Sequence, residues 1–206
     1  MPVKLNSTGG GSVTLTTPST ASDFTATFPA NTGNVVTTGS SAVVTPAMLT
    51  QPLTSGTAVT ASGTSVDFTG IPSWVKRVTV MFNGVSTNGT SIKQIQLGDA
   101  GGFETTGYLG AGIQLTDATS VNAATITTGF GIRSALAADT INGAVIIANL
   151  TGNTWVAQGS LTDSSRGAGY LVGGAKALSD VLTQVRITTV GGTDTFDAGS
   201  INILYE

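Results

Sequence analysis

Apolar and polar residues alternate along short stretches of this chain, and glycines and Ser-Thr clusters separate these stretches. The clearest stretch runs from Val75 to Phe82 and ends at Asn83-Gly84, a pair that favours tight turns. Alternation with a period of two is typical of β-strands with one buried face. No window has the i, i+3, i+4, i+7 spacing of an amphipathic helix, and the best helical candidate is the short segment 45–49. The chain is therefore predicted to be all-β.

The same pattern continues to the C-terminus and predicts an antiparallel β-sandwich of jelly-roll type. The run 144–148 is apolar at every position, which predicts a central strand that is covered on both sides. The predicted strands are residues 75–82, 91–97, 125–130, 144–150, 155–160, 169–172, 185–189 and 200–205.

Three short strands are predicted in the N-terminal segment as well. Their apolar side chains alternate and are expected to make assembly contacts; they include Val13, Leu15, Phe24, Phe28 and Val35. Burying so few side chains contributes less free energy than ordering about 30 residues costs. We therefore expect this segment to be ordered only when copies of the chain, or a partner, share its apolar faces.

Charge divides the chain into parts. Only Lys4 and Asp23 are charged before Asp67, and a polar stretch precedes that aspartate. We expect an N-terminal β anchor at residues 1–45, a connector at 46–62 and a β-sandwich domain at 63–206.

Charged residues are rare overall, at 9% of 206 residues with a net charge of −3, whereas 40% are hydrophobic. So few charges predict a surface that is covered by further copies or by a larger assembly. The basic residues form no cluster, which argues against nucleic-acid binding. The longest apolar run is too short to insert into a membrane, and residues 1–11 lack the apolar core of a signal peptide.

The chain contains neither cysteine nor histidine, which excludes disulfides, thiol chemistry and histidine-dependent catalytic triads. The glycines at 9–11 lack the lysine and the helix of a phosphate-binding loop. We therefore predict a non-enzymatic protein without a cofactor. Two acidic arrangements remain open: Asp99 and Glu104 could approach each other as a catalytic pair, and the loop 191–197 could either bind calcium or form a hairpin turn.

Two aromatic residues suggest an alternative function, the binding of a glycan. Trp155 and Tyr170 lie in predicted strands, where their rings could stack on sugars of a host glycan or could pack in the core.

Two segments resemble known viral proteins. The sequence GGGSVTLTTPSTAS at 9–22, followed by FPANTG at 28–33, resembles a segment of bacteriophage tail fibres and other virion surface fibres. The stretch from Val66 to Tyr108, which begins VDFTGIPSWVKRVTVMFNG, and the final INILYE resemble a C-terminal domain of tail-fibre proteins. The resemblance implies intertwined trimeric β-structure on the outside of a virion.

This resemblance implies a structural role in a virion that is assembled in the host cytoplasm. The chain would be a trimeric short fibre or a capsid decoration (cement) protein. Its N-terminal strands would anchor it to other capsid or tail proteins, and its sandwich would project outward. The alternative is a module that recognises a glycan of the host receptor.

Overall fold

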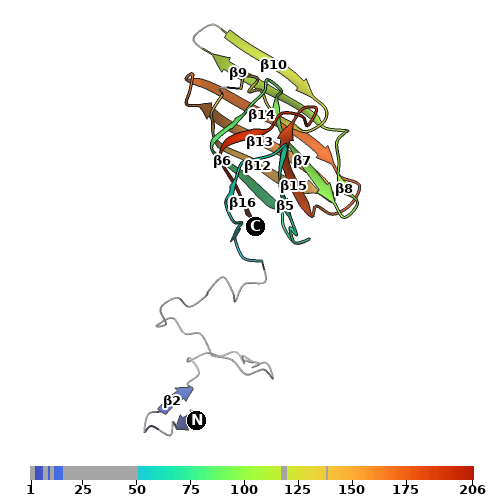
Figure 1. The fold of residues 1–206 in the computed structure, drawn as a ribbon. Coiled ribbons are helices and arrows are strands. Elements are labelled where there is room, and N and C mark those ends of the chain that lie inside the picture. Colours follow the sequence, from blue (N-terminus) through green and yellow to red (C-terminus); the bar gives the residue numbers. More distant parts are fainter. Residues whose placement is uncertain (1–2, 7–8, 10–11, 16–50, 117–119, 138) are drawn as a thin grey trace. The chain divides into compact units, whose positions relative to one another are not determined.

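The computed structural model describes residues 3–6, 9, 12–15, 51–116, 120–137 and 139–206 (Figure 1). The chain divides into two compact units, Met1–Val43 and Val44–Glu206. The described residues form strands and turns but no helix, which confirms the predicted all-β class. No helix in this described part could therefore span a lipid bilayer. The helical candidate at 45–49 lies outside the described residues.

The first unit contains a two-stranded antiparallel sheet of β1 (Val3–Asn6) and β2 (Ser12–Leu15). Val13 and Leu15 lie in β2, where Val13 is opposite Leu5. The other predicted assembly residues, Phe24, Phe28 and Val35, lie outside the described residues.

The second unit is a sandwich of two antiparallel sheets of unequal size. The nine-stranded sheet has the order β10 (Ser120–Ile126), β9 (Leu109–Thr116), β14 (Ala168–Ala177), β13 (Thr154–Asp163), β12 (Ile141–Thr151), β6 (Arg77–Thr87), β16 (Phe196–Tyr205) and β3 (Thr54–Ser55), with β4 (Val59–Thr60) also paired to β16. The five-stranded sheet has the order β11 (Phe130–Ile132), β7 (Lys93–Asp99), β15 (Gln184–Thr189) and β5 (Ser65–Thr69), with β8 (Gly102–Phe103) paired to β7.

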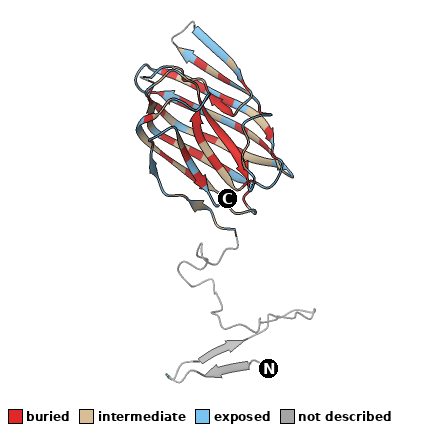
Figure 2. Ribbon diagram, turned by 45° about the vertical axis from the view of Figure 1, so that its right-hand side comes forward, coloured by how far each residue is buried: buried red, intermediate tan, exposed pale blue. Residues whose placement is uncertain are grey.

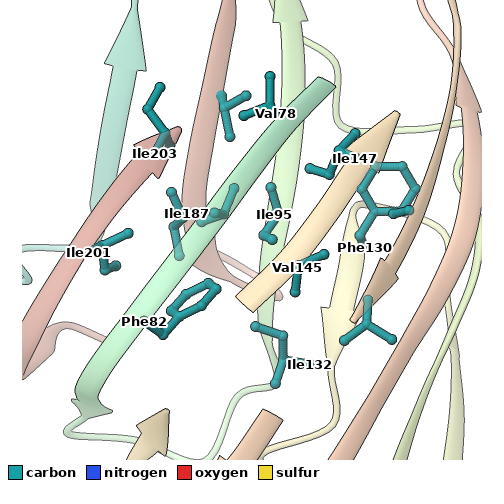
Figure 3. Packing of buried hydrophobic residues seen from close by; sticks show 14 of the residues in the cluster. Val78, Phe82, Ile95, Phe130, Ile132, Val145, Ile147, Ile187, Ile201 and Ile203 are labelled. Atoms are coloured by element: carbon teal, nitrogen blue, oxygen red, sulfur yellow. The ribbon is translucent and has the colours of Figure 1, made fainter. Parts of the chain in front are cut away.

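The core lies between these sheets, because alternate residues of each sheet point toward the other. Val145 and Ile147 of the larger sheet and Ile95 and Ile187 of the smaller one are fully buried (Figure 3). This packing confirms an antiparallel β-sandwich. The jelly-roll arrangement within that class stays a prediction.

The predicted turn at Asn83-Gly84 is wrong, because β6 continues through it to Thr87. Asn83 and Gly84 together face the single residue Asn142 of β12, which makes a β-bulge. Gly84 has a φ of +65°, and its N–H donates to Oδ1 of Asn142 at 2.8 Å. The extra residue keeps the later side chains of β6 in register with the core, so Val85 is still fully buried.

The predicted strand at 125–130 is also wrong, because it is divided between the two sheets. β10 ends at Ile126 in the larger sheet, and β11 begins at Phe130 in the smaller one. The residues between the two strands are Thr127, Thr128 and Gly129, and this short segment crosses from one sheet to the other. Ile126 and Phe130 are both buried and an even number of residues apart, so their spacing fits one continuous strand and gives no sign of the crossing.

The apolar run 144–148 lies in β12, which is central in the nine-stranded sheet as predicted. Its inward residues Val145 and Ile147 are fully buried, whereas the outward residues Ala144, Ile146 and Ala148 are half-buried. Within the described part of the chain, no second layer covers this outward side.

Candidate functional site

The two aromatic rings expected to stack on glycan lie inside the sandwich. Trp155 is 3% exposed, and Tyr170 is fully buried. Both belong to the hydrophobic core. Because a ring must present an open face to stack on a sugar, the stacking role predicted for Trp155 and Tyr170 is wrong.

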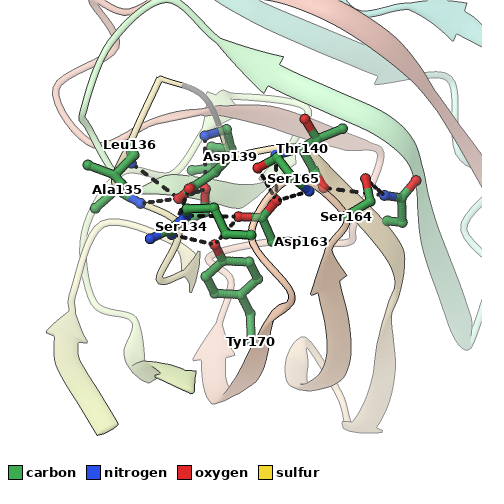
Figure 4. A network of polar contacts seen from close by, with 12 residues as sticks. Ser134, Ala135, Leu136, Asp139, Thr140, Asp163, Ser164, Ser165 and Tyr170 are labelled. Carbon is green, nitrogen blue, oxygen red and sulfur yellow. Dashed lines mark hydrogen bonds and ion pairs between the residues drawn. The ribbon is translucent and has the colours of Figure 1, made fainter. Parts of the chain in front are cut away.

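A buried network of charged groups adjoins Tyr170 (Figure 4). Arg166 Nη2 lies 2.7 Å from Oδ1 of Asp139, and Arg166 Nε lies 3.2 Å from Oδ2 of Asp163. The Tyr170 hydroxyl donates to Asp163 at 3.3 Å, and burial raises the pKa of Tyr170 to about 12. Arg166 therefore pairs with two carboxylates that are almost fully buried, and its single positive charge balances one of the two negative charges.

Lys93 extends the network from the other sheet. Its Nζ donates to the Ser134 hydroxyl at 3.0 Å, and that hydroxyl donates to Oδ2 of Asp139 at 3.0 Å. Burial lowers the pKa of Lys93, and the charge of Asp139 opposes this change. Lys93 and Ser134 are shielded from solvent, so these groups stabilise the fold and cannot reach a substrate.

The carboxylates of Asp99 and Glu104 meet at Ser179, whose hydroxyl lies 2.6 Å from the first and 2.8 Å from the second. The hydrogen bond from Ser179 lowers the pKa of Asp99. Burial opposes ionisation of Glu104, but bonds from Lys176 and Ser179 outweigh it and lower its pKa. Neither carboxyl is the protonated acid that a glycosidase needs at neutral pH.

The loop 191–197 is not a hairpin turn, because it joins β15 of one sheet to β16 of the other. Asp194 accepts a hydrogen bond from the backbone N–H of Ser91 at 2.7 Å, and Asp197 accepts one from the Ser86 hydroxyl. No cluster of three or more metal-binding side chains occurs among the described residues. These aspartates fasten the crossing loop to the segments around Ser86 and Ser91.

The outer face of the nine-stranded sheet is open to solvent. We define the outer face as the outward side chains of β10, β9, β14, β13 and β12, and Figure 2 shows the exposure of β10. Leu109, Leu115, Val121 and Leu171 are between 41% and 77% exposed. The strand register places Leu171 beside Ile113 and Leu115 beside Val121, so apolar side chains on neighbouring strands are contiguous.

The outer face is also free of charge. The five strands that form it contain two charged residues, Asp163 and Lys176, and both point inward and are buried. Two grooves of about 500 and 520 Å³ lie on this face and share Leu171 and Val172 in their linings. An uncharged apolar surface of this kind is suited to contact with another protein surface.

A second surface, the polar cleft, lies over the five-stranded sheet and has a volume of about 370 Å³. Its lining includes Gln94 and Gln96 of β7 and Arg186 and Thr189 of β15. No sequence motif marks these residues. The available signal was that the glutamines alternate with Ile95 and Leu97, so that the polar face of β7 is distinct from its core face.

Comparisons with protein-family models, with curated proteins and with solved structures found no match for this chain. Its function is therefore inferred from the chemistry of its surfaces and from the resemblance of its sequence segments.

The outer face and the polar cleft belong to different sheets of the sandwich and differ in chemistry. The outer face presents aliphatic side chains such as Leu171, and the cleft is lined by amide and hydroxyl residues such as Gln94 and Thr105. The chemistry of the outer face favours burial against a protein, and the chemistry of the polar cleft favours a small polar ligand.

Proposed function

We propose that this chain is a non-enzymatic structural protein of a bacteriophage virion, a trimeric short fibre or a capsid decoration (cement) protein. The resemblance of segments 9–33 and 66–108 to virion fibres motivates the virion role. The observation that carries the assembly role is the uncharged, apolar outer face, which a soluble monomer would leave in water.

The occupant of the outer face is a second copy of the chain. A surface without charge attracts no oppositely charged partner, and it loses no ion hydration when another uncharged surface of a neighbouring copy covers it, as the heterologous contacts of a trimer require. Five strands about 4.8 Å apart and about 30 Å long cover roughly 700 Å², close to the ~800 Å² that each partner buries in a stable interface. The apolar outward residues of β12, which include Ile146, then become buried on both sides.

The N-terminal strands attach the assembly to other virion proteins of the capsid or tail. Val13 and Leu15 lie in β2, whose sheet has only two strands among the described residues. A two-stranded sheet is marginally stable in water by itself, which supports sharing of strands between copies or with a partner. Glycan recognition through Trp155 and Tyr170 is not part of this proposal, because both rings are buried.

The assembly role is tested by measuring the mass of the full chain in solution by light scattering after size exclusion. We expect three times the mass of one chain. Leu171→Lys or Val121→Lys places a charge on the outer face of every copy, and burial of an unpaired charge should weaken association by roughly 100-fold or more. Val181→Lys is the matched control, because Val181 is 40% exposed but lies outside these strands.

The result that contradicts the proposal is a wild-type monomer at micromolar concentration. An oligomer that Leu171→Lys and Val121→Lys leave intact would contradict the assignment of the outer face. Tracing the chain in images of intact virions then separates a decoration protein, which covers the capsid regularly, from a fibre, which occurs at the tail.

A further inference from the structure

The larger sheet has an unprotected edge at β10 (Figure 1). The seven residues of this strand, Ser120–Ile126, contain neither a charge nor a proline, and they pair with β9 at every position without a bulge. Most of them are exposed, and Val121 is 67% exposed. Edge strands that must stay single usually carry a charge, a proline or a bulge, because their free N–H and C=O groups pair readily with a further strand. β10 is therefore suited to accept such a strand.

The opposite edge of the same sheet has matching properties. β3 and β4 lie there beside β16, and together they span residues 54–60, a segment as long as β10. No charged residue occurs between residues 51 and 66. Each of the two strands pairs with β16 over only two residues, so a further strand on their free side would extend a short ladder. Both edges of the sheet are thus uncharged and open to pairing.

The two edges run in opposite directions. The path from β10 to β3 contains eight strands, and every neighbouring pair along it is antiparallel, so its first and last strands are antiparallel as well. A rotation about an axis parallel to the strands preserves their directions. Copies related by such a rotation and placed edge to edge would therefore bring β10 of one copy antiparallel to β3 of the next, as in every other pair of this sheet.

We infer that β10 of each copy pairs with the β3–β4 edge of the neighbouring copy, so that three copies join their larger sheets head to tail around a three-fold axis. This inference rests on the proposed trimer, because pairing of β10 with a second β10 is two-fold and does not close a ring of three. The apolar outer faces then turn toward the axis. The smaller sheets, with the ion pair of Arg186 and Asp67, face the solvent.

Engineered disulfides test this pairing, because the chain has no cysteine of its own. Ser55→Cys is combined, in three separate variants, with Val121→Cys, Ala123→Cys or Thr125→Cys. These three positions share the outer side of β10, and Ser55 lies opposite Leu204 on the outer side of β16. Within one copy, seven intervals of about 4.8 Å separate the two edges by about 34 Å, which is too far for a disulfide.

We expect at least one double variant to give a covalent trimer on a non-reducing gel and a single chain after reduction. Ser55→Cys with Thr162→Cys is the matched control, because Thr162 is exposed on β13, in the middle of the sheet, and should give no covalent trimer. Melting temperatures under reducing conditions show which variants fold like wild type.

Hydrogen exchange of the wild-type chain gives a second measurement that needs no substitution. About half of the amides in a free edge strand have no partner in the protein and exchange quickly. In the trimer we expect all amides of β10 to exchange slowly, because those that face away from β9 bond to the neighbouring copy.

The inference is overturned if wild type has the mass of a trimer but no folded double variant forms a covalent trimer, or if half of the β10 amides exchange quickly. Either result leaves the proposed trimer intact, whereas a wild-type monomer contradicts the trimer itself. Covalent dimers from Val121→Cys, Ala123→Cys or Thr125→Cys alone would show that β10 pairs with a second β10, and they also overturn the inference.

Discussion

At the scale of single residues, the buried carboxyl of Asp163 has a strongly lowered pKa. Burial by itself opposes ionisation of its carboxylate and would raise its pKa. The hydroxyl of Ser165 at 2.6 Å and the backbone N–H groups of Ser165 and Thr140, at 2.8 and 3.0 Å, outweigh that effect and lower the pKa to about 2. The carboxylate is therefore a tightly bonded acceptor at neutral pH.

This low pKa predicts an acid-sensitive contribution to stability. Between about pH 4 and pH 2 the unfolded chain takes up a proton at Asp163 while the folded chain does not, so stability falls as the pH falls through this range. The full contribution, present above about pH 4, is about 2 kcal/mol. Melting temperatures of wild type and Asp163→Asn at pH 7, 4 and 2 measure it.

We expect Asp163→Asn to be less stable than wild type at pH 7 and to approach it at pH 2. Asp99 and Glu104 also have lowered pKa values and titrate in both proteins, so the comparison cancels them. Parallel melting curves across the whole range would contradict the role given to Asp163.

At the scale of elements, paired bulges shape the crossing of β6 and β16. Gly84 makes the bulge in β6, and Gly199 lies opposite it in β16 with a φ of +89°. The registers of both strands shift at this point. A Cβ atom at Gly199 would lie 2.4 Å from the carbonyl oxygen of Gly84, so the strands can approach this closely only with glycine at 199.

Gly199→Ala should therefore destabilise the sandwich by about 2–4 kcal/mol, from backbone strain and a steric clash. Gly173→Ala is the matched control, because a Cβ there would have no atom within 4 Å and Gly173 does not have a positive φ. Urea unfolding at equal protein concentration measures both. A Gly199→Ala variant as stable as Gly173→Ala would show that the two strands can separate at the bulge without cost.

At the scale of the whole chain, the second unit contains a complete core of its own. The core residues, which include Val145 and Ile187, come from strands that begin after residue 50. The unit Val44–Glu206 is therefore expected to fold without the segment that precedes it.

A chain that begins at residue 46 tests this division. We expect its melting temperature to match that of the sandwich in the full chain, because no core residue is removed. For the same reason, its circular dichroism signal, divided by the number of residues in strands, should match that of the sandwich in the full chain. Under the proposed function it no longer attaches to the virion. An unfolded or aggregated 46–206 fragment would mean that the N-terminal segment contributes to the fold of the sandwich.

Local periodicity was enough to predict most of the long strands. The strand at 144–150 was predicted from a continuous apolar run and those at 155–160 and 185–189 from their local residue pattern, and both signals depend only on neighbours in the sequence. β9 was missed, since its small residues Gly110, Ala111 and Gly112 give a weak strand signal. The turn at Asn83-Gly84 was predicted wrongly, because the same pair serves a turn or a bulge and only the facing strand distinguishes them.

The candidate surfaces depended on pairing between distant strands. Gln94 reaches Thr189 only because β7 pairs with β15. Asp99 and Glu104 meet at Ser179, a residue far along the chain, and the sequence around the two carboxylates does not indicate this contact. The sequence by itself therefore determined the strand class, the scarcity of charge and the lack of histidine and cysteine chemistry. The tertiary structure decided that Trp155 is buried, that the face around Leu171 is exposed and that a polar cleft exists, because alternation marks two faces without saying which is covered.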